Sequence, residues 1–222
     1  MMKIDQIVRT RRKTIALIVQ RDGSLVVRAP LRASDKQIRE LVQKKEKWII
    51  AKQGAARRTY AEIRSREYVN GEGFLYLGKT YKLAIVDDNQ PLLTFGDQFY
   101  LAKSALPHAA AVFKTWYRQQ ARQVISERVT WYAAQNGFVY QRVNITSART
   151  RWGSCGGRGS LNFTWRLVMA PLQVIDYVVV HELAHLKQKN HSKAYWNEVK
   201  RLMPDYQQQI NWLNENGPTL RL

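Results

Sequence analysis

The feature that most constrains this chain is the pentapeptide His-Glu-Leu-Ala-His at residues 181–185, which directly follows the apolar run Val178-Val179-Val180. Two histidines four residues apart lie on one face of a helix, about 5–6 Å apart at Cβ, so both imidazoles can bind one metal ion. Glu182 lies about 100° further round the helix, where it can reach a metal-bound water without being a ligand. The motif therefore predicts a helix with metal ligands at His181 and His185 and a general base at Glu182.

A catalytic zinc ion needs a third protein ligand if it is to keep one open position, and His191 is the best candidate. It lies ten residues after His181 and directly follows Asn190, a residue that often ends helices. The spacing matches the extended HExxHxxGxxH pattern, except that Gln188 occupies the glycine position. We therefore expect the chain to turn at residues 189–190 instead.

Other polar residues are candidates for secondary roles at this site. His108, at the start of an expected long helix, and Glu198, seven residues beyond His191, are weaker candidates for a metal ligand. Asp176, Asn190 or backbone carbonyl groups are candidates to orient the imidazoles.

The periodicity of apolar residues predicts an α+β fold, with a small antiparallel β-rich N-terminal part that contains one helix and a mainly helical part after it. In the first part we expect a hairpin (14–20 and 24–29, turning at Arg21-Asp22-Gly23), a helix from the capping box Ser34–Gln37 to Gly54, and strands at 74–77, 81–86, 92–95 and 99–102. In the second we expect a long helix from Pro107 to Asn136, strands at 142–147 and 160–165, and helices at 172–189, after Ser192, and at 205–215. The expected division is 1–104, basic and β-rich, and 105–222, which binds the metal.

The charge of the chain is strongly positive and unevenly distributed. There are 36 Lys and Arg against 17 Asp and Glu, a net charge of +19, and residues 1–70 contain 18 of these cations and seven acids. Such an excess attracts polyanions, so nucleic acid, nucleotides and anionic lipid are plausible partners, although a solvated basic surface is an equally simple interpretation. With 45% apolar residues, the chain has enough material for a globular core.

Targeting signals are not evident in the sequence. No apolar run reaches 18 residues, and the N-terminus lacks the apolar segment of a secretory signal, so we expect no membrane span and a cytoplasmic location. The single cysteine, Cys155, fits a reducing compartment.

A glycine-rich loop at residues 149–159 combines four glycines with Arg149, Arg151 and Arg158. Glycines permit close backbone approach to a ligand and guanidinium groups suit phosphate or carboxylate, so the three arginines are candidate substrate-binding residues. A structural turn with solvated arginines is the alternative. Cys155 within this loop is a small buried residue, a reactive thiol or an auxiliary metal ligand.

Residues 147–215 resemble the YgjP-like metal-dependent hydrolases, zincin-like proteins related to the SprT-like metalloproteases. The resemblance rests on Arg151-Trp152-Gly153-Ser154-Cys155, Leu161-Asn162-Phe163, residues 176–186, Asn190-His191-Ser192 and Tyr195-Trp196. A weaker resemblance extends through residues 28–30, 46–49 and 77–81. The resemblance to this family implies a zincin-like catalytic part that holds one zinc ion per chain on His181, His185 and His191, with Glu182 catalytic.

Three functions are compatible with these features. The first is a zinc-dependent hydrolase of the metallopeptidase type, which acts on peptides. The second uses the same zinc and Glu182 on a phosphoanhydride such as a nucleoside triphosphate, as a pyrophosphohydrolase, because the charge and the arginine-rich loop favour phosphate. The third is a nucleic-acid-binding module whose zinc is structural.

Overall fold

The structure is a computed structural model that describes residues 2–20, 23–62, 66–88 and 91–222. It contains two compact units, Met1–Arg66 and Glu67–Leu222. The strands expected at the end of the first part belong to the second unit, so the division precedes Glu67 and does not fall near residue 104. The physical reason is a shared aromatic core, in which Phe74 stacks on Phe113 with ring centroids 4.2 Å apart and Phe99 lies 4.9 Å from Trp116.

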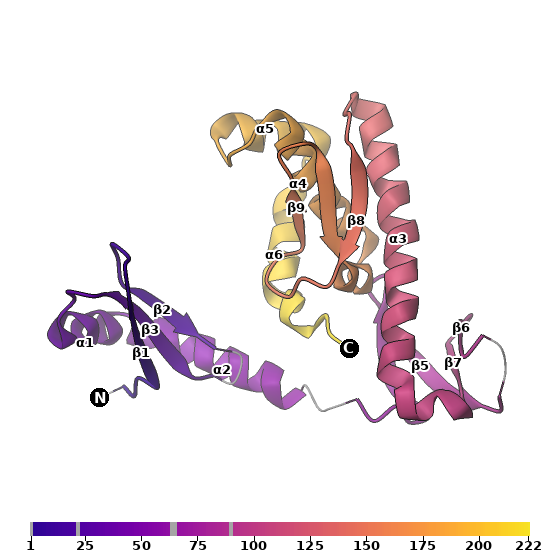
Figure 1. Ribbon diagram of the computed structural model, residues 1–222, viewed down its shortest axis with the longest axis horizontal. Helices are drawn as coiled ribbons and strands as arrows, with labels where there is room; N and C mark the ends of the chain where they lie inside the picture. The colour runs from indigo at the N-terminus through magenta and orange to yellow at the C-terminus, as the bar shows by residue number, and fades with distance from the viewer. Residues whose placement is uncertain (1, 21–22, 63–65, 89–90) are drawn as a thin grey trace. The chain divides into compact units, whose positions relative to one another are not determined.

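The first unit is a three-stranded sheet with two helices (Figure 1). Strands β1 (Gln6–Thr10), β2 (Ala16–Val19) and β3 (Leu25–Pro30) are arranged in the order β1-β3-β2. The antiparallel pairing of β2 with β3 confirms the expected hairpin, although Arg21 and Asp22 of its turn lie outside the described residues. β1 was not expected, and it pairs parallel to β3.

Two helices replace the single helix expected between Ser34 and Gly54. They are α1 (Asp35–Lys44) and α2 (Glu46–Glu62), separated at Lys45. The capping box is confirmed, since the Ser34 hydroxyl accepts from the Gln37 backbone N–H and the Gln37 side chain accepts from the Ser34 N–H. Leu25, Val27 and Ala29 of β3 form a small core with Ile38, Val42 and Ile49 of the helices.

The second unit begins with a four-stranded sheet. Its strands are β4 (Gly73–Tyr76), β5 (Lys79–Val86), β6 (Leu93–Phe95) and β7 (Phe99–Ala102), in the order β4-β5-β7-β6. The expectation of a purely antiparallel sheet is wrong, because β5 and β7 are parallel. β6 and β7 form a hairpin, and it is the second strand of this hairpin that joins β5.

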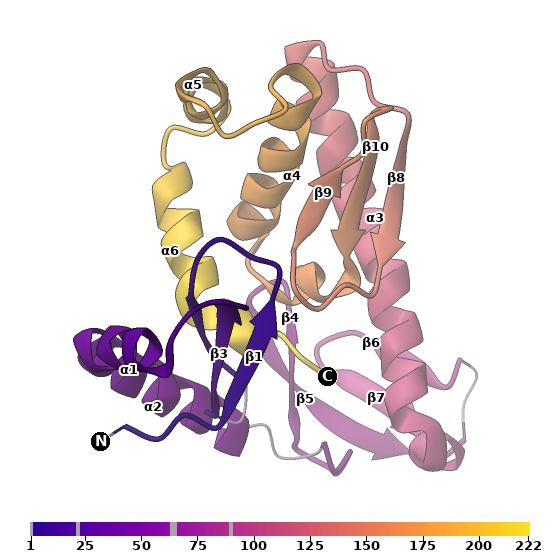
Figure 2. The ribbon, with the colours of Figure 1, turned by 60° about the vertical axis from the view of Figure 1, so that its left-hand side comes forward.

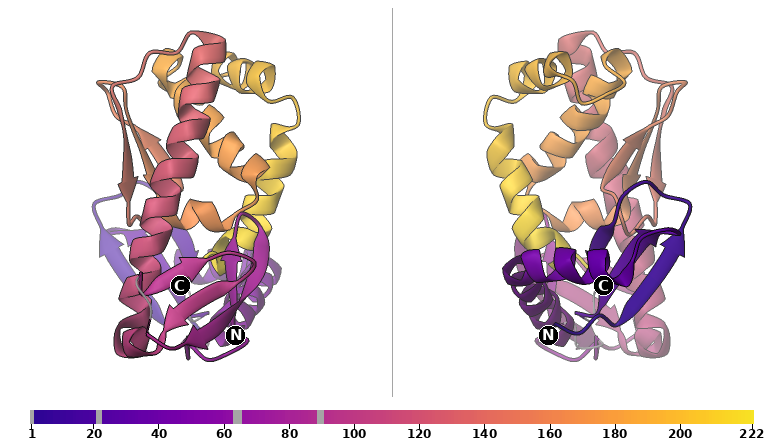
Figure 3. Two further views of the ribbon diagram at one scale, coloured as in Figure 1. Left: turned by 90° about the vertical axis from the view of Figure 1, so that its right-hand side faces the viewer. Right: turned by 90° about the vertical axis from the view of Figure 1, so that its left-hand side faces the viewer.

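The 3-10 segment η1 (Lys103–His108) leads into the long helix α3 (Ala109–Asn136), which ends as expected at Gly137 in the left-handed region, at φ +64°. The second sheet of this unit follows, with β8 (Arg142–Thr146), β9 (Gly153–Cys155) and β10 (Ser160–Thr164) in the order β8-β10-β9. α3 contacts β6 of the first of these sheets and β8 of the second (Figure 3). The strand order places β9 at the edge of its sheet, antiparallel to β10.

The remaining elements are the 3-10 segments η2 (Trp165–Met169) and η3 (Gly217–Thr219) and the helices α4 (Leu172–Lys187), α5 (Lys193–Leu202) and α6 (Tyr206–Asn216). Figure 2 shows α4 between α6 and the sheet of β8, β9 and β10. This arrangement confirms the α+β fold. In the described part of the chain, no helix is long and apolar enough to cross a membrane.

The start of α4 is fixed by the turn between β4 and β5. The N–H groups of Leu77 and Gly78 donate to the carbonyls of Val168 and Met169, just before the helix. Gly78 has φ +80°, and a Cβ there would lie 2.7 Å from Cγ of Pro171, so only glycine fits this close approach. The helix that carries the His-Glu-Leu-Ala-His motif is thus positioned by the core of the unit.

Candidate metal centre

His181 and His185 are one turn apart on α4, the most deeply buried helix of the second unit. Residues 174–180 and 182–184 are buried, because α4 packs against α3, α5, α6 and β9. The two imidazoles reach the partly open side of the helix, with ring centroids 5.0 Å apart. Their placement follows from the helical spacing that the sequence predicted.

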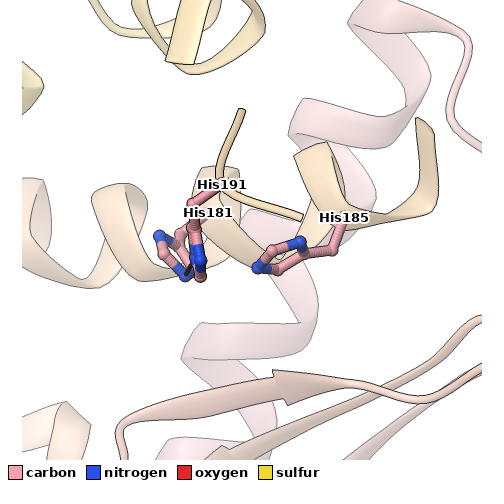
Figure 4. Close-up of side chains that lie close together, drawn as sticks. All are labelled: His181, His185 and His191. Carbon is pink, nitrogen blue, oxygen red and sulfur yellow. Dashed lines mark hydrogen bonds between the residues drawn. The ribbon is translucent and has the colours of Figure 1, made fainter. Parts of the chain in front are cut away.

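His191 comes from the segment between α4 and α5 and joins the other two histidines (Figure 4). Its Nε2 lies 3.3 Å from Nε2 of His181, and the three residues offer ring nitrogens that all lie within 4.8 Å of one another. The chain leaves α4 at Gln188, which has extended backbone angles, and the Ser192 hydroxyl caps α5. A non-glycine residue can thus make the turn, because it needs no left-handed conformation.

Two hydrogen bonds orient the imidazoles. Nδ1 of His185 lies 3.0 Å from the carbonyl oxygen of Gln188, which can only accept, so this nitrogen carries the proton and leaves Nε2 free as a ligand. The Tyr177 hydroxyl lies 3.4 Å from Nδ1 of His181 and can either donate a hydrogen bond to this nitrogen or accept one from it. Of the proposed orienting groups, a backbone carbonyl has this position, whereas Asp176 forms an ion pair with Arg128 of α3 at 2.5 Å.

Tyr195 supports the same face of α4. Its side chain is fully buried, its ring stacks on His185 with centroids 4.6 Å apart, and its hydroxyl donates to the backbone carbonyl of His181. Sequence reasoning gave Tyr177 no role and expected Tyr195 to affect packing more than chemistry. The helical spacing offered one signal for Tyr177, which precedes His181 by four residues.

The electrostatics of the site favour the neutral forms of His181 and His185. Burial lowers the pKa of His181 to about 4, and the neighbouring imidazoles add to the shift. Burial also lowers the pKa of His185. Both rings are therefore neutral at pH 7 and can offer a lone pair to a cation.

Glu182, the residue after His181 on α4, is in a largely desolvated position. The residue is 3% exposed, and its Oε2 has no hydrogen-bond partner among the described residues. Burial raises the pKa of Glu182 to about 8, against the opposing attraction of Arg151. A buried carboxyl oxygen without a partner is costly, and such atoms are common at functional sites.

Gly153 of β9 makes room for this carboxyl group. A Cβ at residue 153 would lie 2.4 Å from Oε1 of Glu182 and 2.8 Å from its Cδ. The edge strand β9 therefore packs with its backbone directly against the Glu182 side chain. Sequence reasoning marked the loop as glycine-rich but could not identify this contact.

The three arginines of the glycine-rich loop are all exposed. Arg151 is the one whose charge acts on Glu182, and it lines a pocket of about 200 Å³ with Trp152, Ser154 and Asn162. Because Gly153 faces Glu182, Ser154 points to the opposite face of the sheet, and this pocket opens on that face. No described contact joins Arg149 or Arg158 to Glu182 or to the histidines, so their role stays a prediction.

The other candidate ligands have different surroundings. His108 stands at the N-cap position of α3, where its side chain makes no capping hydrogen bond. Glu198 accepts hydrogen bonds from Arg201 and Lys187, which lower its pKa to about 2. Cys155 is half-buried, and burial raises the pKa of its thiol, which disfavours the reactive thiolate. Within the described ranges, His181, His185 and His191 form the one cluster of three or more such side chains that could hold a metal ion.

Comparison with known proteins gives a family. A family model described as YgjP-like, metallopeptidase domain, matches residues 13–216. No match was found among curated protein sequences. A solved structure, the crystal structure of the metallopeptidase zymogen of Pyrococcus abyssi abylysin, is similar at 18% identity and a TM-score of 0.38, over 41% of this chain and 93% of that chain.

Proposed function

The chain belongs to the YgjP-like family of metallopeptidase domains, and on that basis we propose that it is a zinc-dependent peptidase with Glu182 as its general base. One observation carries the proposal. Three imidazoles converge on one point beside a buried carboxyl group whose Oε2 has no partner among the described residues.

The donor set fits a catalytic zinc ion. His181, His185 and His191 would hold it, and three nitrogen ligands leave one coordination position open. A structural zinc ion prefers four protein ligands, often including cysteine. Among the described residues, the cluster of possible ligands consists of the three histidines and does not include Cys155. This donor set therefore argues against a nucleic-acid-binding module with a structural zinc.

Zinc, when bound, supplies Lewis acidity, which polarises the scissile carbonyl group and makes water in the site more acidic. Glu182 accepts the proton of the attacking water and then delivers it to the leaving amine. Without the metal, burial raises the pKa of Glu182 to about 8, so the carboxyl group is mostly protonated at pH 7. A nearby divalent cation favours the carboxylate form, so this pKa falls when the metal is present.

A peptide substrate fits the edge strand β9. Ser154 is paired with Asn162 of β10, and the Gly156 N–H and the Trp152 carbonyl also form hydrogen bonds with the chain at β10. Because alternate residues of an antiparallel strand face alternate edges, the N–H and C=O groups of Gly153 and Cys155 point to the free edge. An extended peptide can pair with those groups, as in other cases of strand addition to a sheet edge. Because Gly153 contacts Glu182, a peptide bound there would pass next to the general base.

Phosphoanhydride hydrolysis is the second candidate. The observation in its favour is Arg151, whose guanidinium lies close enough to affect Glu182 and suits a phosphate group. Arg149 and Arg158 lack any described contact with the site, so we rank a nucleotide substrate below a peptide.

The direct test compares wild-type protein with Glu182→Gln on two substrate sets. Unstructured proteins such as casein are followed by fragment mass, and nucleoside triphosphates by released phosphate or pyrophosphate. We expect peptide cleavage by the wild type, a loss of at least about 10³-fold in Glu182→Gln, and unchanged zinc content. Glu127→Gln is the matched control, because it neutralises an exposed carboxylate on α3 and should leave the activity unchanged.

Equal activity in Glu182→Gln would eliminate the general-base role. Phosphate release that depends on Glu182, without peptide cleavage, would replace the first candidate by the second.

A further inference from the structure

The first unit has a charge that the metal centre does not explain. Its 66 residues contain 18 Lys and Arg and six Asp and Glu, so it carries +12 of the total +19. It also has its own hydrophobic core of residues from β3, α1 and α2. This unit is therefore a compact body with a strong positive charge.

The topology of its sheet gathers several of these cations at one end. β1 and β3 are parallel, and their last residues, Thr10 and Pro30, are partners across the ladder. β2 runs the opposite way and begins at Ala16, the partner of Arg28. The segments that follow β1 and β3 thus leave the sheet at the same end, where they bring together a set that we call the basic end: Arg11, Arg12, Lys13, Arg28 and Arg32.

The cations of the basic end have no acidic partners in the described chain. Arg11, Lys13, Arg28 and Arg32 are exposed, and no described residue forms a side-chain hydrogen bond or ion pair with any of them. The Nε of Arg12 is buried and likewise has no partner among the described residues. Asp35, the acid close to this end, is already bound by Arg9. Among the described residues, therefore, no carboxylate balances the charge of these four exposed cations or pairs with Nε of Arg12.

An aromatic pocket lies beside the basic end. It has a volume of about 270 Å³ and is lined by Ile15, Leu17, Leu41, Lys45 and Trp48. Trp48 is 44% exposed, so one part of its ring is available to a ligand. Lys13 is two residues from Ile15, within about 7 Å along the chain, so a polyanion held at the basic end reaches this pocket.

We propose that the first unit binds single-stranded nucleic acid, with phosphates at the basic end and a base stacked on Trp48. Positively charged grooves with an aromatic platform are the usual means of binding single strands without sequence preference. Four of the five cations are arginines, whose planar guanidinium groups suit phosphate geometry better than the point charge of lysine. The end of a three-stranded sheet is about 10 Å wide, enough for two or three consecutive phosphates at their spacing along a strand.

An anionic membrane is the competing partner, since Leu31 at the basic end is 59% exposed. Membrane binding by a surface helix needs a broad apolar face on one helix, whereas the other exposed large apolar residues of this unit, Ile7, Trp48 and Ile50, are spread over β1 and α2. We therefore favour nucleic acid and make vesicles an outcome of the test.

The test measures binding of the full chain to a labelled oligothymidylate of about 15 nucleotides by fluorescence anisotropy, at salt concentrations between about 50 and 200 mM. The charge variant is Arg11→Ala with Lys13→Ala, which leaves the partly buried Arg12 intact. Its matched control, Lys3→Ala with Lys52→Ala, removes the same charge away from the basic end. Lys3 precedes β1, and Gln53, the residue after Lys52, donates to the carbonyl of Gly23, which precedes β3. Trp48→Leu removes the ring and keeps an apolar side chain.

We expect log affinity to fall linearly with log salt, and the charge variant to reduce the slope by about 1.4 and the affinity by about tenfold or more. The control pair should change both much less. Trp48→Leu should weaken binding about fivefold to a hundredfold with little change in slope, because stacking is not ionic. A duplex of equal length should bind more weakly than the single strand.

Three results would overturn the proposal. They are a salt-independent affinity, equal losses in the charge variant and its control, or tighter binding to phosphatidylserine vesicles than to the oligonucleotide. Circular dichroism of each variant shows whether the fold is retained, and binding by Glu182→Gln at wild-type strength separates this surface from the metal centre.

Discussion

At the residue scale, the site depends on what surrounds Glu182 as much as on the histidines. Helical spacing alone predicted the positions of His181, His185 and Glu182 relative to one another, because all three lie within two turns of α4. The contact of Gly153 with Glu182 could not be predicted, since it joins strands and helices that are distant in sequence. The turn was predicted at residues 189–190, whereas the chain leaves α4 at Gln188. The extended backbone of Gln188 has no signal in the sequence.

Gly153→Ala tests this packing. Its added Cβ would lie 2.4 Å from Oε1 of Glu182, so the carboxyl group or β9 must move. We expect a loss of stability of about 1–3 kcal/mol, and lower peptidase activity with zinc content retained. Thermal unfolding and zinc analysis measure both.

Gly157→Ala is the control for this substitution, because a Cβ there meets nothing within 4 Å. Equal effects of the two substitutions would mean that the contact with Glu182 has no special importance.

Tyr177→Phe tests the orientation of His181. The variant loses the hydroxyl that lies 3.4 Å from Nδ1 and keeps the ring. Loss of a group that orients a metal-binding histidine typically weakens metal affinity about tenfold or more. Competition with a chromophoric chelator measures this affinity, and Tyr140→Phe, whose hydroxyl lies near Thr130, serves as the control. An unchanged zinc affinity would assign Tyr177 to packing.

At the element scale, short-range signals predicted well and pairing partners did not. The capping box at Ser34, the left-handed Gly137 after α3 and the cap at Ser192 are local features, and each marks a helix end in the structure. β1 was missed because residues 6–10 are mostly exposed and show no alternation of apolar residues. The parallel pairing of β5 with β7 depends on long-range packing, which local patterns do not encode.

Glu198 connects two of these elements, since it lies on α5 and forms ion pairs with Lys187 of α4 and Arg201. These partners lower its pKa from 4.5 to about 2, so the stabilisation is present above about pH 4.5 and is lost as the pH falls toward 2. We expect Glu198→Gln to reduce the free energy of unfolding by about 1 kcal/mol at pH 7. The difference from wild type should shrink as the pH falls below about 4.5.

Urea unfolding across this pH range measures the difference, with Glu127→Gln as the control. A constant difference at all pH values would show that the charge of Glu198 does not stabilise the connection.

At the scale of the whole molecule, the two compact units differ in their charge and in the functional groups that they contain. The second unit contains the three histidines, Glu182 and the edge strand β9, and the first contains most of the positive charge. Composition predicted the charge asymmetry correctly. It did not predict where the units divide, because the strands at residues 73–102 resemble those of the first unit in pattern but share their aromatic core with α3.

The three-histidine metal centre is tested by the zinc content of tag-free protein, measured by elemental mass spectrometry for wild type, His181→Ala, His191→Ala and His108→Ala. We expect about one zinc ion per chain in wild type and in His108→Ala, and loss of zinc in the other two variants. Full zinc content in His191→Ala, or no zinc in wild type after reconstitution, would contradict this expectation.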